Sequence, residues 1–213
     1  MLLKKFYGLT VFKNNILSQK DDDQVKKYLF IIPLLILGQL TLSSSIAYAF
    51  DQNWYAKGLQ AEFAGDYQTA IAYYTKSANM GLSDANFAIG RSYKMLGNDI
   101  SSLEWFLKAA KAGNKFAQYE AGLIYLNGSS ATVANSGEAE KWFTFAAKSN
   151  HGEAAYEIFN LNQDEKWLKQ AAEQGVQEAM QGLANLYKSG ANGFEVDIDE
   201  SKRWTQRVVE SKE

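Results

Sequence analysis

The sequence predicts an all-α protein, an α-solenoid of antiparallel helix pairs preceded by a hydrophobic leader helix. Two observations predict this fold: two kinds of segment alternate along the chain, and proline is almost absent. The segments have the spacing of amphipathic helices, and proline occurs once among the 213 residues, at Pro33. The chain after Pro33 therefore lacks the residue that most strongly breaks helices.

The first recurring segment begins with Trp and ends with Gly or Asn. Trp is followed four residues later by Ala-Ala in WFLKAAKAG (105–113), WFTFAAKSN (142–150) and WLKQAAEQG (167–175). Apolar and small residues at spacings of three and four indicate a helix that packs on one face. We expect this segment to form the second helix of each pair and to end in a left-handed Gly or Asn.

The second recurring segment carries Ala and, eight residues later, Tyr. It appears as DANFAIGRSY (84–93), FAQYEAGLIY (116–125) and EAMQGLANLY (178–187). Its small residues, among them Gly90 and Gly122, would let two helix axes approach closely, so we expect it to form the first helix of each pair. The predicted units are 52–81, 84–113, 116–150, 153–175 and 178–213, and the fourth must have a curtailed first helix or loop.

Three residues are expected to cap helix N-termini. Ser101 with Glu104 and Asn162 with Glu165 have the spacing of capping boxes. Ser83 precedes another first-helix segment and is expected to cap it.

These units resemble Sel-1-like repeats, whose first helix carries A-x-x-x-x-G-x-x-Y and whose second carries W-[FY]-x-x-A-A-x-x-G. Units 84–113 and 116–150 have both patterns, and 153–175 and 178–213 have them in part. The first unit, Trp54 to Gly81, looks more like the related tetratricopeptide repeat. The resemblance covers residues 52–213 and implies a helical-repeat fold.

Residues 1–49 have the features of a signal peptide. Residues 28–50 carry no charge, follow Lys26 and Lys27, and include Ala47-Tyr48-Ala49, which predicts cleavage after Ala49 and a periplasmic or secreted chain. The alternative is an uncleaved anchor that holds the repeat domain outside the cytoplasm. The absence of Cys excludes a lipid-modified lipoprotein cysteine.

Charge argues against nucleic acid as a partner. The net charge is −2 at pH 7, and the chain after residue 49 is more acidic still, because residues 1–49 hold six Lys and three Asp. A body without a basic stripe lacks the cations that neutralise phosphates. We expect no nucleic-acid partner, and contact with a membrane only through an uncleaved leader.

The sequence predicts no catalytic, cofactor or metal site. The single histidine, His151, follows a helix-ending Asn, a place where the Sel-1-like pattern often has His, so we interpret it as a turn residue. Glu195, Asp197, Asp199 and Glu200 form an acidic cluster that lacks the EF-hand pattern and is expected to cap and stabilise the N-terminus of the last helix.

The candidate site is a concave groove lined by the first helices, if the tetratricopeptide register carries over. The predicted residues are Tyr55, Leu59, Glu62, Phe87, Arg91, Lys94, Tyr119, Leu123, Leu126, Gln181, Asn185 and Lys188. Aromatic and Arg side chains suit peptide recognition. The alternative is that Phe87, Tyr119 and Leu123 belong to the core between helices.

Two functional hypotheses follow. The first is an exported, non-enzymatic protein that binds another protein or peptide through the groove, as an envelope adaptor or regulator. The second, of a different class, is an envelope-acting hydrolase or cell-wall sugar-binding protein that uses acidic residues of the groove.

Overall fold

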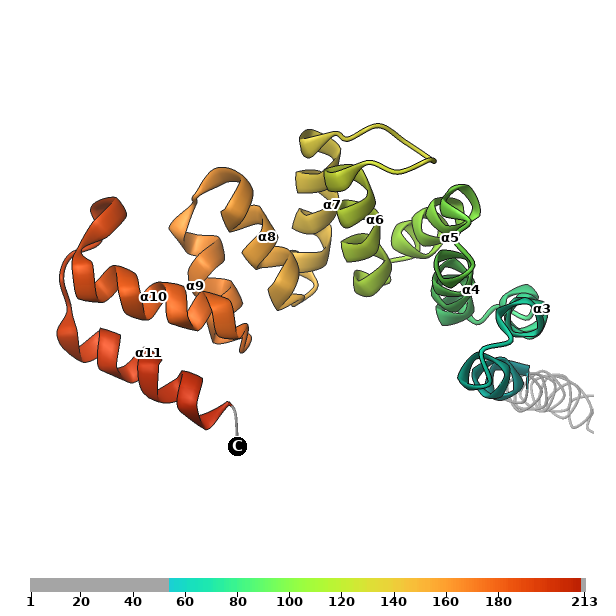
Figure 1. The fold of residues 1–213 in the computed structure, drawn as a ribbon, viewed down its shortest axis with the longest axis horizontal. Helices are drawn as coiled ribbons and strands as arrows, with labels where there is room; N and C mark the ends of the chain where they lie inside the picture. Colours follow the sequence, from blue (N-terminus) through green and yellow to red (C-terminus); the bar gives the residue numbers. More distant parts are fainter. Residues whose placement is uncertain (1–53, 212–213) are drawn as a thin grey trace, which may run out of the picture. The chain divides into compact units, whose positions relative to one another are not determined.

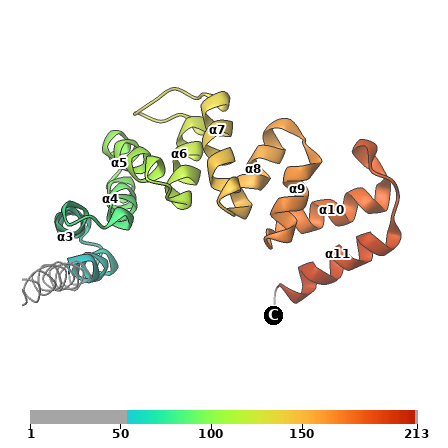
Figure 2. The same cartoon turned by 180° about the vertical axis from the view of Figure 1, so that it is seen from behind.

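The computed structural model describes residues 54–211, and this part of the chain is built from α-helices (Figures 1 and 2). Apart from an isolated bridge between Ser129 and Thr132, residues 54–211 contain no β-structure. The predicted leader, 1–49, lies outside the described residues. Within the described part, no helix has both the length and the apolar character needed to span a bilayer.

The helices follow one another with short connections. Residues 54–63 are helical. They precede α3 (Tyr67–Asn79), α4 (Ser83–Met95), α5 (Asp99–Lys111), α6 (Lys115–Asn127), α7 (Ser136–Lys148), α8 (Gly152–Asn162), α9 (Glu165–Glu173), α10 (Gln177–Ser189), a 3-10 turn (Ala191–Gly193) and α11 (Ile198–Glu210). Each helix from α3 onward packs against the next along the chain. The predicted all-α solenoid is confirmed.

A glycine on the first helix lies directly against an aromatic ring of the second helix in three successive pairs. The pairs are Gly58 with Tyr74, Gly90 with Phe106, and Gly122 with Phe143. A Cβ atom at Gly122 would lie 2.4 Å from Cε1 of Phe143, closer than real contacts allow. All three rings are fully buried. The glycines therefore let the two helices approach until the ring fills the space between them.

The Ala-Ala pairs of the second helices form the small-residue part of the core. Ala109 and Ala110 of α5, Ala146 and Ala147 of α7, and Ala171 and Ala172 of α9 are all buried. Larger apolar side chains, such as Ile158 and Leu183, pack around them. Alternation of small and large residues along facing helices gives close packing without voids.

The turns from each second helix to the next first helix have left-handed residues where the sequence predicted them. Gly81, Gly113 and Gly175 have φ values of 105°, 92° and 89°, and Asn150 has a φ of 63°. After Asn150, the amide of His151 donates to the carbonyl of Ala146 at 3.1 Å, the bond that closes a Schellman motif. This prediction is confirmed.

The three predicted N-caps are wrong. Helix α5 begins earlier than expected, and Asn98 caps it by accepting a hydrogen bond from the amide of Ser101 at 3.1 Å. Asn162 is the last residue of α8, and Asp164 caps α9. Ser83 is the first residue of α4, whose N-cap makes no side-chain bond. In α5 and α9, an Asn or Asp near the expected residue supplies the carboxylate or amide oxygen instead.

The fourth unit is shortened in its first helix and at its turn, as predicted, and also at the start of its second helix: α8 has 11 residues, whereas α4 and α6 have 13 each. Only Gln163 and Asp164 separate α8 from α9. Helix α9 has 9 residues, whereas α5 and α7 have 13 each. Trp167 is the third residue of α9, but Trp105 and Trp142 are the seventh residues of their helices. The residues missing from α9 therefore amount to its first helical turn.

Every tryptophan lies beneath a positively charged side chain. Lys76 lies over Trp54 at 4.3 Å, Lys108 over Trp105 at 4.3 Å, Lys141 over Trp142 at 5.9 Å, Lys166 over Trp167 at 5.1 Å and Arg207 over Trp204 at 4.6 Å. These are distances to ring centroids at which cation–π attraction operates. One such pair occurs in each predicted unit.

Candidate functional site

The structure places the predicted groove residues on first helices, with their side chains partly or fully exposed. Eight of them are half-buried: Tyr55, Leu59, Glu62, Phe87, Arg91, Tyr119, Leu123 and Leu126. Lys94 of α4 and the three residues of α10, Gln181, Asn185 and Lys188, are exposed. We call this set the first-helix face.

Hydrogen bonds and an ion pair join the first two units. Oε2 of Glu62 accepts a hydrogen bond from the hydroxyl of Tyr74 at 2.6 Å and another from Nη2 of Arg91 at 2.7 Å. Burial would lower the pKa of Arg91, but the hydrogen bond and charge of Glu62 outweigh this effect and raise it. Burial and the same carboxylate raise the pKa of Tyr74, which keeps its hydroxyl protonated as a donor.

A cavity of about 390 Å³ adjoins this ion pair. It is lined by Leu59, Glu62, Phe63, Tyr67, Arg91 and Met95. Phe63 is 90% exposed and Met95 is 58% exposed, so apolar surface surrounds the ion pair. The sequence prediction included Leu59, Glu62 and Arg91 but missed the other three, because they lie at helix ends and fall outside the assumed register.

A second ion pair joins the next two units. Nζ of Lys94 lies 2.7 Å from Oε2 of Glu120 on α6. As in the first pair, the cation comes from α4 and is the more exposed partner, with side-chain exposures of 49% for Lys94 and 23% for Glu120. An ion pair therefore joins the first helix of the first unit to that of the second, and another joins the first helix of the second unit to that of the third.

Aromatic stacking joins α6 to the residue that caps α8. The ring of Tyr119 on α6 stacks on the imidazole of His151, with centroids 4.6 Å apart and planes inclined by 23°. Burial and the carboxylates of Glu157 and Glu153 raise the pKa of Tyr119 to about 12. Phe87, Tyr119 and Leu123 each pack against a buried cluster. These three side chains therefore contribute to the inter-helix core, as the alternative interpretation held, while keeping part of their surface exposed.

The fourth unit adds two residues that sequence reasoning missed. Tyr156 and Asn160 follow Ala154 at the same spacings at which Tyr119 and Leu123 follow Ala117. Tyr156 is half-buried and Asn160 is exposed. The irregular length of this unit hid the correspondence, but the spacing from Ala154 would have revealed it.

His151 serves as a helix cap. Its Nδ1 accepts a hydrogen bond from the amide of Ala154 at 3.4 Å, which caps α8, and the side chain is only 7% exposed. Burial lowers the pKa of His151, against the opposing effect of Glu153, whose Oε2 lies 3.2 Å from Nδ1. A buried, neutral imidazole that accepts a backbone hydrogen bond agrees with its expected place in a turn.

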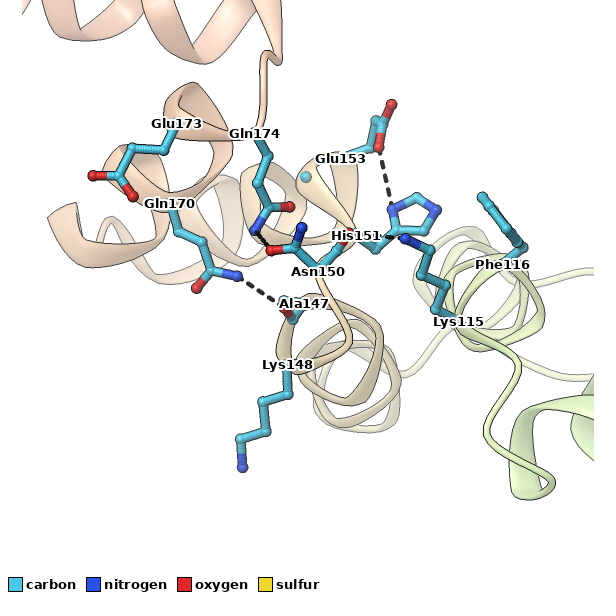
Figure 3. Close-up of a pocket in the computed structure, with 11 residues that line it drawn as sticks. Lys115, Phe116, Ala147, Lys148, Asn150, His151, Glu153, Gln170, Glu173 and Gln174 are labelled. Carbon is cyan, nitrogen blue, oxygen red and sulfur yellow. Dashed lines mark hydrogen bonds and ion pairs between the residues drawn. The ribbon is translucent and has the colours of Figure 1, made fainter.

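A cavity of about 630 Å³ lies beside His151, where side chains of α6, α7, α8 and α9 meet (Figure 3). Polar groups in its wall bond one another across the junction. Nε2 of Gln174 donates to Oδ1 of Asn150 at 2.8 Å, Nζ of Lys115 donates to the Asn150 carbonyl at 3.0 Å, and Nε2 of Gln170 donates to the Ala147 carbonyl at 2.8 Å. The two Gln bonds tie the third unit to the fourth, and the Lys115 bond joins the two ends of the third unit.

The acidic cluster caps a helix, as expected. Oδ1 of Asp197 accepts hydrogen bonds from the amides of Asp199 and Glu200 at 3.0 and 2.9 Å at the start of α11. Among residues 54–211, no three His, Cys, Asp or Glu side chains are grouped so that they could hold a metal ion.

The repeated helix pairs and their contacts match a known family. A model of the Sel1 repeat matches residues 46–82, 84–114, 115–151, 165–176 and 177–208. The chain therefore belongs to the Sel1 repeat family. The match includes the first unit, which we expected to look more like a tetratricopeptide repeat, and leaves out residues 152–164, which contain α8.

Several solved structures are similar to this chain, and two of them share its fold over about three quarters of its length. The crystal structure of a Sel1 repeat protein from Oxalobacter formigenes is 25% identical with a TM-score of 0.63, over 74% of this chain and 68% of that one. The structure of c5321, described as a protective antigen of uropathogenic Escherichia coli strains, is 22% identical with a TM-score of 0.63, over 76% of this chain but only 39% of that one. A search of curated proteins gave no match.

Proposed function

We propose that this chain is a non-enzymatic binding protein that holds another protein or a peptide on its first-helix face. Membership of the Sel1 repeat family supports the proposal, since Sel1 repeats are generally protein-interaction modules. The single observation that carries it is the composition of that face: half-buried aromatic rings and an Arg side chain that are fixed by contacts yet keep exposed surface.

Fixed, partly exposed anchors favour binding for an energetic reason. Tyr119 is held by its stack on His151, and Arg91 by its bond to Glu62. A side chain that is already ordered loses little conformational entropy when a partner covers it. Tyr and Arg are also the residue types that contribute most at protein interfaces.

Two carboxylates, Glu62 of the first-helix face and Glu120 beside it, are engaged in a way that disfavours hydrolysis. Glu62 is paired with Arg91 and accepts the Tyr74 hydroxyl, and Glu120 is paired with Lys94. Both carboxylates are occupied by ion pairs and largely covered, with side-chain exposures of 16% for Glu62 and 23% for Glu120, so neither is free to meet a substrate. This arrangement favours binding over an enzymatic role.

Site-specific photo-crosslinking in the native host tests the proposal. A photoreactive phenylalanine analogue at Leu123 should form a covalent adduct with a discrete partner, and an analogue at Leu126 should capture the same one. The matched control is Phe145, which is 46% exposed on the second helix α7. Adducts that form equally at Phe145, or none at Leu123 and Leu126, would contradict the proposal.

We further propose export of the chain, with cleavage after Ala49 and a role as an envelope adaptor or regulator. The uncharged run 28–50, its basic flank and the Ala47-Tyr48-Ala49 sequence support it. N-terminal sequencing of the protein from the native host should find Phe50 first. A full-length membrane-bound form would instead favour the anchor.

A further inference from the structure

We propose that the cavity between the first two units binds an acidic segment of a partner that inserts one large apolar side chain. This inference rests on the proposed binding function and adds the chemistry of the partner. The site is the cavity lined by Leu59, Glu62, Phe63, Tyr67, Arg91 and Met95, which we call the N-terminal hollow.

The exposed apolar side chains on the rim of the N-terminal hollow favour an apolar ligand group. Phe63 is 90% exposed, the highest value among the exposed large apolar side chains of residues 54–211, and Met95 is 58% exposed. Leu59 and Tyr67 are half-buried on the same wall. A partner side chain in the hollow would remove apolar surface from water on several sides at once. A flat surface would cover Phe63 but would leave the hollow unfilled.

In the two ion pairs near the hollow, the cation is the more exposed partner. In the Glu62–Arg91 pair the side-chain exposures are 16% for the carboxylate and 43% for the guanidinium. The Glu120–Lys94 pair has the same asymmetry, at 23% and 49%. Arg91 and Lys94 are three residues apart on α4 and thus share a side of that helix. An approaching ligand therefore meets two cations, while their carboxylate partners are largely covered.

The inner carboxylates help to keep these cations in place. Each cation is tied to the neighbouring first helix by a 2.7 Å bond, so its position is set before a partner arrives. Arg91 bonds Glu62 through Nη2 only, and a guanidinium has five N–H donors. The hollow therefore offers positioned hydrogen-bond donors beside apolar surface, which complements an acidic segment with an apolar side chain.

Selection of peptides by the full chain tests the partner's chemistry. The purified full-length protein, immobilised in mild detergent, would select binders from a phage library of random peptides about 12 residues long. The enriched peptides should be acidic and should contain Phe, Leu, Ile or Met. Their synthetic copies should bind the full chain more weakly as salt is raised, because exposed charges are screened.

Variants locate the binding to the hollow. Phe63→Ser should weaken binding of the selected peptides by about tenfold, since it removes the most exposed apolar side chain of the rim. Arg91→Gln with Lys94→Gln should weaken it by about as much and should flatten the salt dependence. The matched controls on α7, Phe145→Ser and Lys141→Gln, should leave affinity within twofold. Phe63 is almost fully exposed, so its loss should leave the thermal midpoint unchanged.

Several results would overturn the inference. Enrichment of basic or neutral peptides, failure to enrich any peptide, or binding insensitive to Phe63→Ser would each exclude an acidic partner in the hollow. If a second copy fills the hollow, sedimentation would show a dimer that Phe63→Ser converts to a monomer, and the inference would also be wrong. In each case adducts at Leu123 would still report on the broader proposed function.

Discussion

Replacing Gly122 by Ala should destabilise the protein, although Ala is the better helix former. The added Cβ would lie 2.4 Å from Cε1 and 2.5 Å from Cδ1 of Phe143. Carbon atoms in contact are about 3.5–4.0 Å apart, so the ring would have to move by about 1 Å or more. Phe143 is fully buried, so a displaced ring would push on the side chains of its cluster.

The expected magnitude follows from two opposing effects. Overpacking a well-filled core costs about 1–3 kcal/mol, and Ala in place of Gly favours a helix by about 1 kcal/mol. Gly122→Ala should therefore lower the free energy of unfolding by up to about 2 kcal/mol. The matched control is Gly182→Ala on α10, where the Cβ would lie 3.6 Å from Cδ1 of Leu168 in ordinary contact. That variant should be about 0.5–1 kcal/mol more stable than the unmodified chain.

Urea unfolding followed by far-ultraviolet circular dichroism measures both variants. The cause of the loss can be isolated in a double-mutant cycle, because Phe143→Leu removes Cε1 and Cζ, two of the three ring atoms that the new Cβ would meet. On that background Gly122→Ala should be tolerated, giving a favourable coupling energy. If Gly122→Ala were as stable as Gly182→Ala, or if the cycle were additive, the close approach of α6 and α7 would not be what requires glycine.

Two further predictions concern helix caps. Burial lowers the pKa of His151 in the folded state below the unfolded value of about 6.5. The contribution of His151 to stability is therefore complete above pH 6.5 and is lost as pH falls toward the folded pKa. The loss is at most about 1.4 kcal/mol per pH unit. His151→Asn keeps a capping oxygen and should lose less stability between pH 7.5 and 5.5; equal losses would refute the assignment. Asp197→Ala should cost about 1 kcal/mol and speed amide exchange in α11, whereas Asp199→Ala should be nearly neutral; equal effects would argue against the cap.

The repeated pattern predicted the helices well because it is carried by residues close in sequence. Ala-Ala pairs mark buried positions of the second helices, and Gly113 or Asn150 marks their ends, since each depends on local geometry. The predicted N-caps were wrong because several residues that can cap a helix lie close together in the sequence. Asn98 and Asp164 lie within a few residues of the expected Ser101 and Asn162, and spacing alone did not decide which residue would cap the helix.

The charged contacts of the candidate site could not be predicted from the chain. Glu62 and Arg91 are 29 residues apart, and Lys94 and Glu120 are 26 apart. Their pairing depends on the distance and rotation between successive units, which the helix period does not determine. The exposure of Phe63 was equally hidden, because its helical spacing alone does not show that the neighbouring unit leaves it uncovered.

The tryptophans beneath their cations provide one internal fluorophore for each unit of the array. Trp54, Trp105, Trp142, Trp167 and Trp204 each have a Lys or Arg over the indole, a local contact that separates when that unit opens. Variants that retain a single Trp would therefore report the opening of one unit at a time through their emission. In a chain whose helices contact mainly their sequence neighbours, such spectra would distinguish unfolding that spreads from an end from unfolding of all units together.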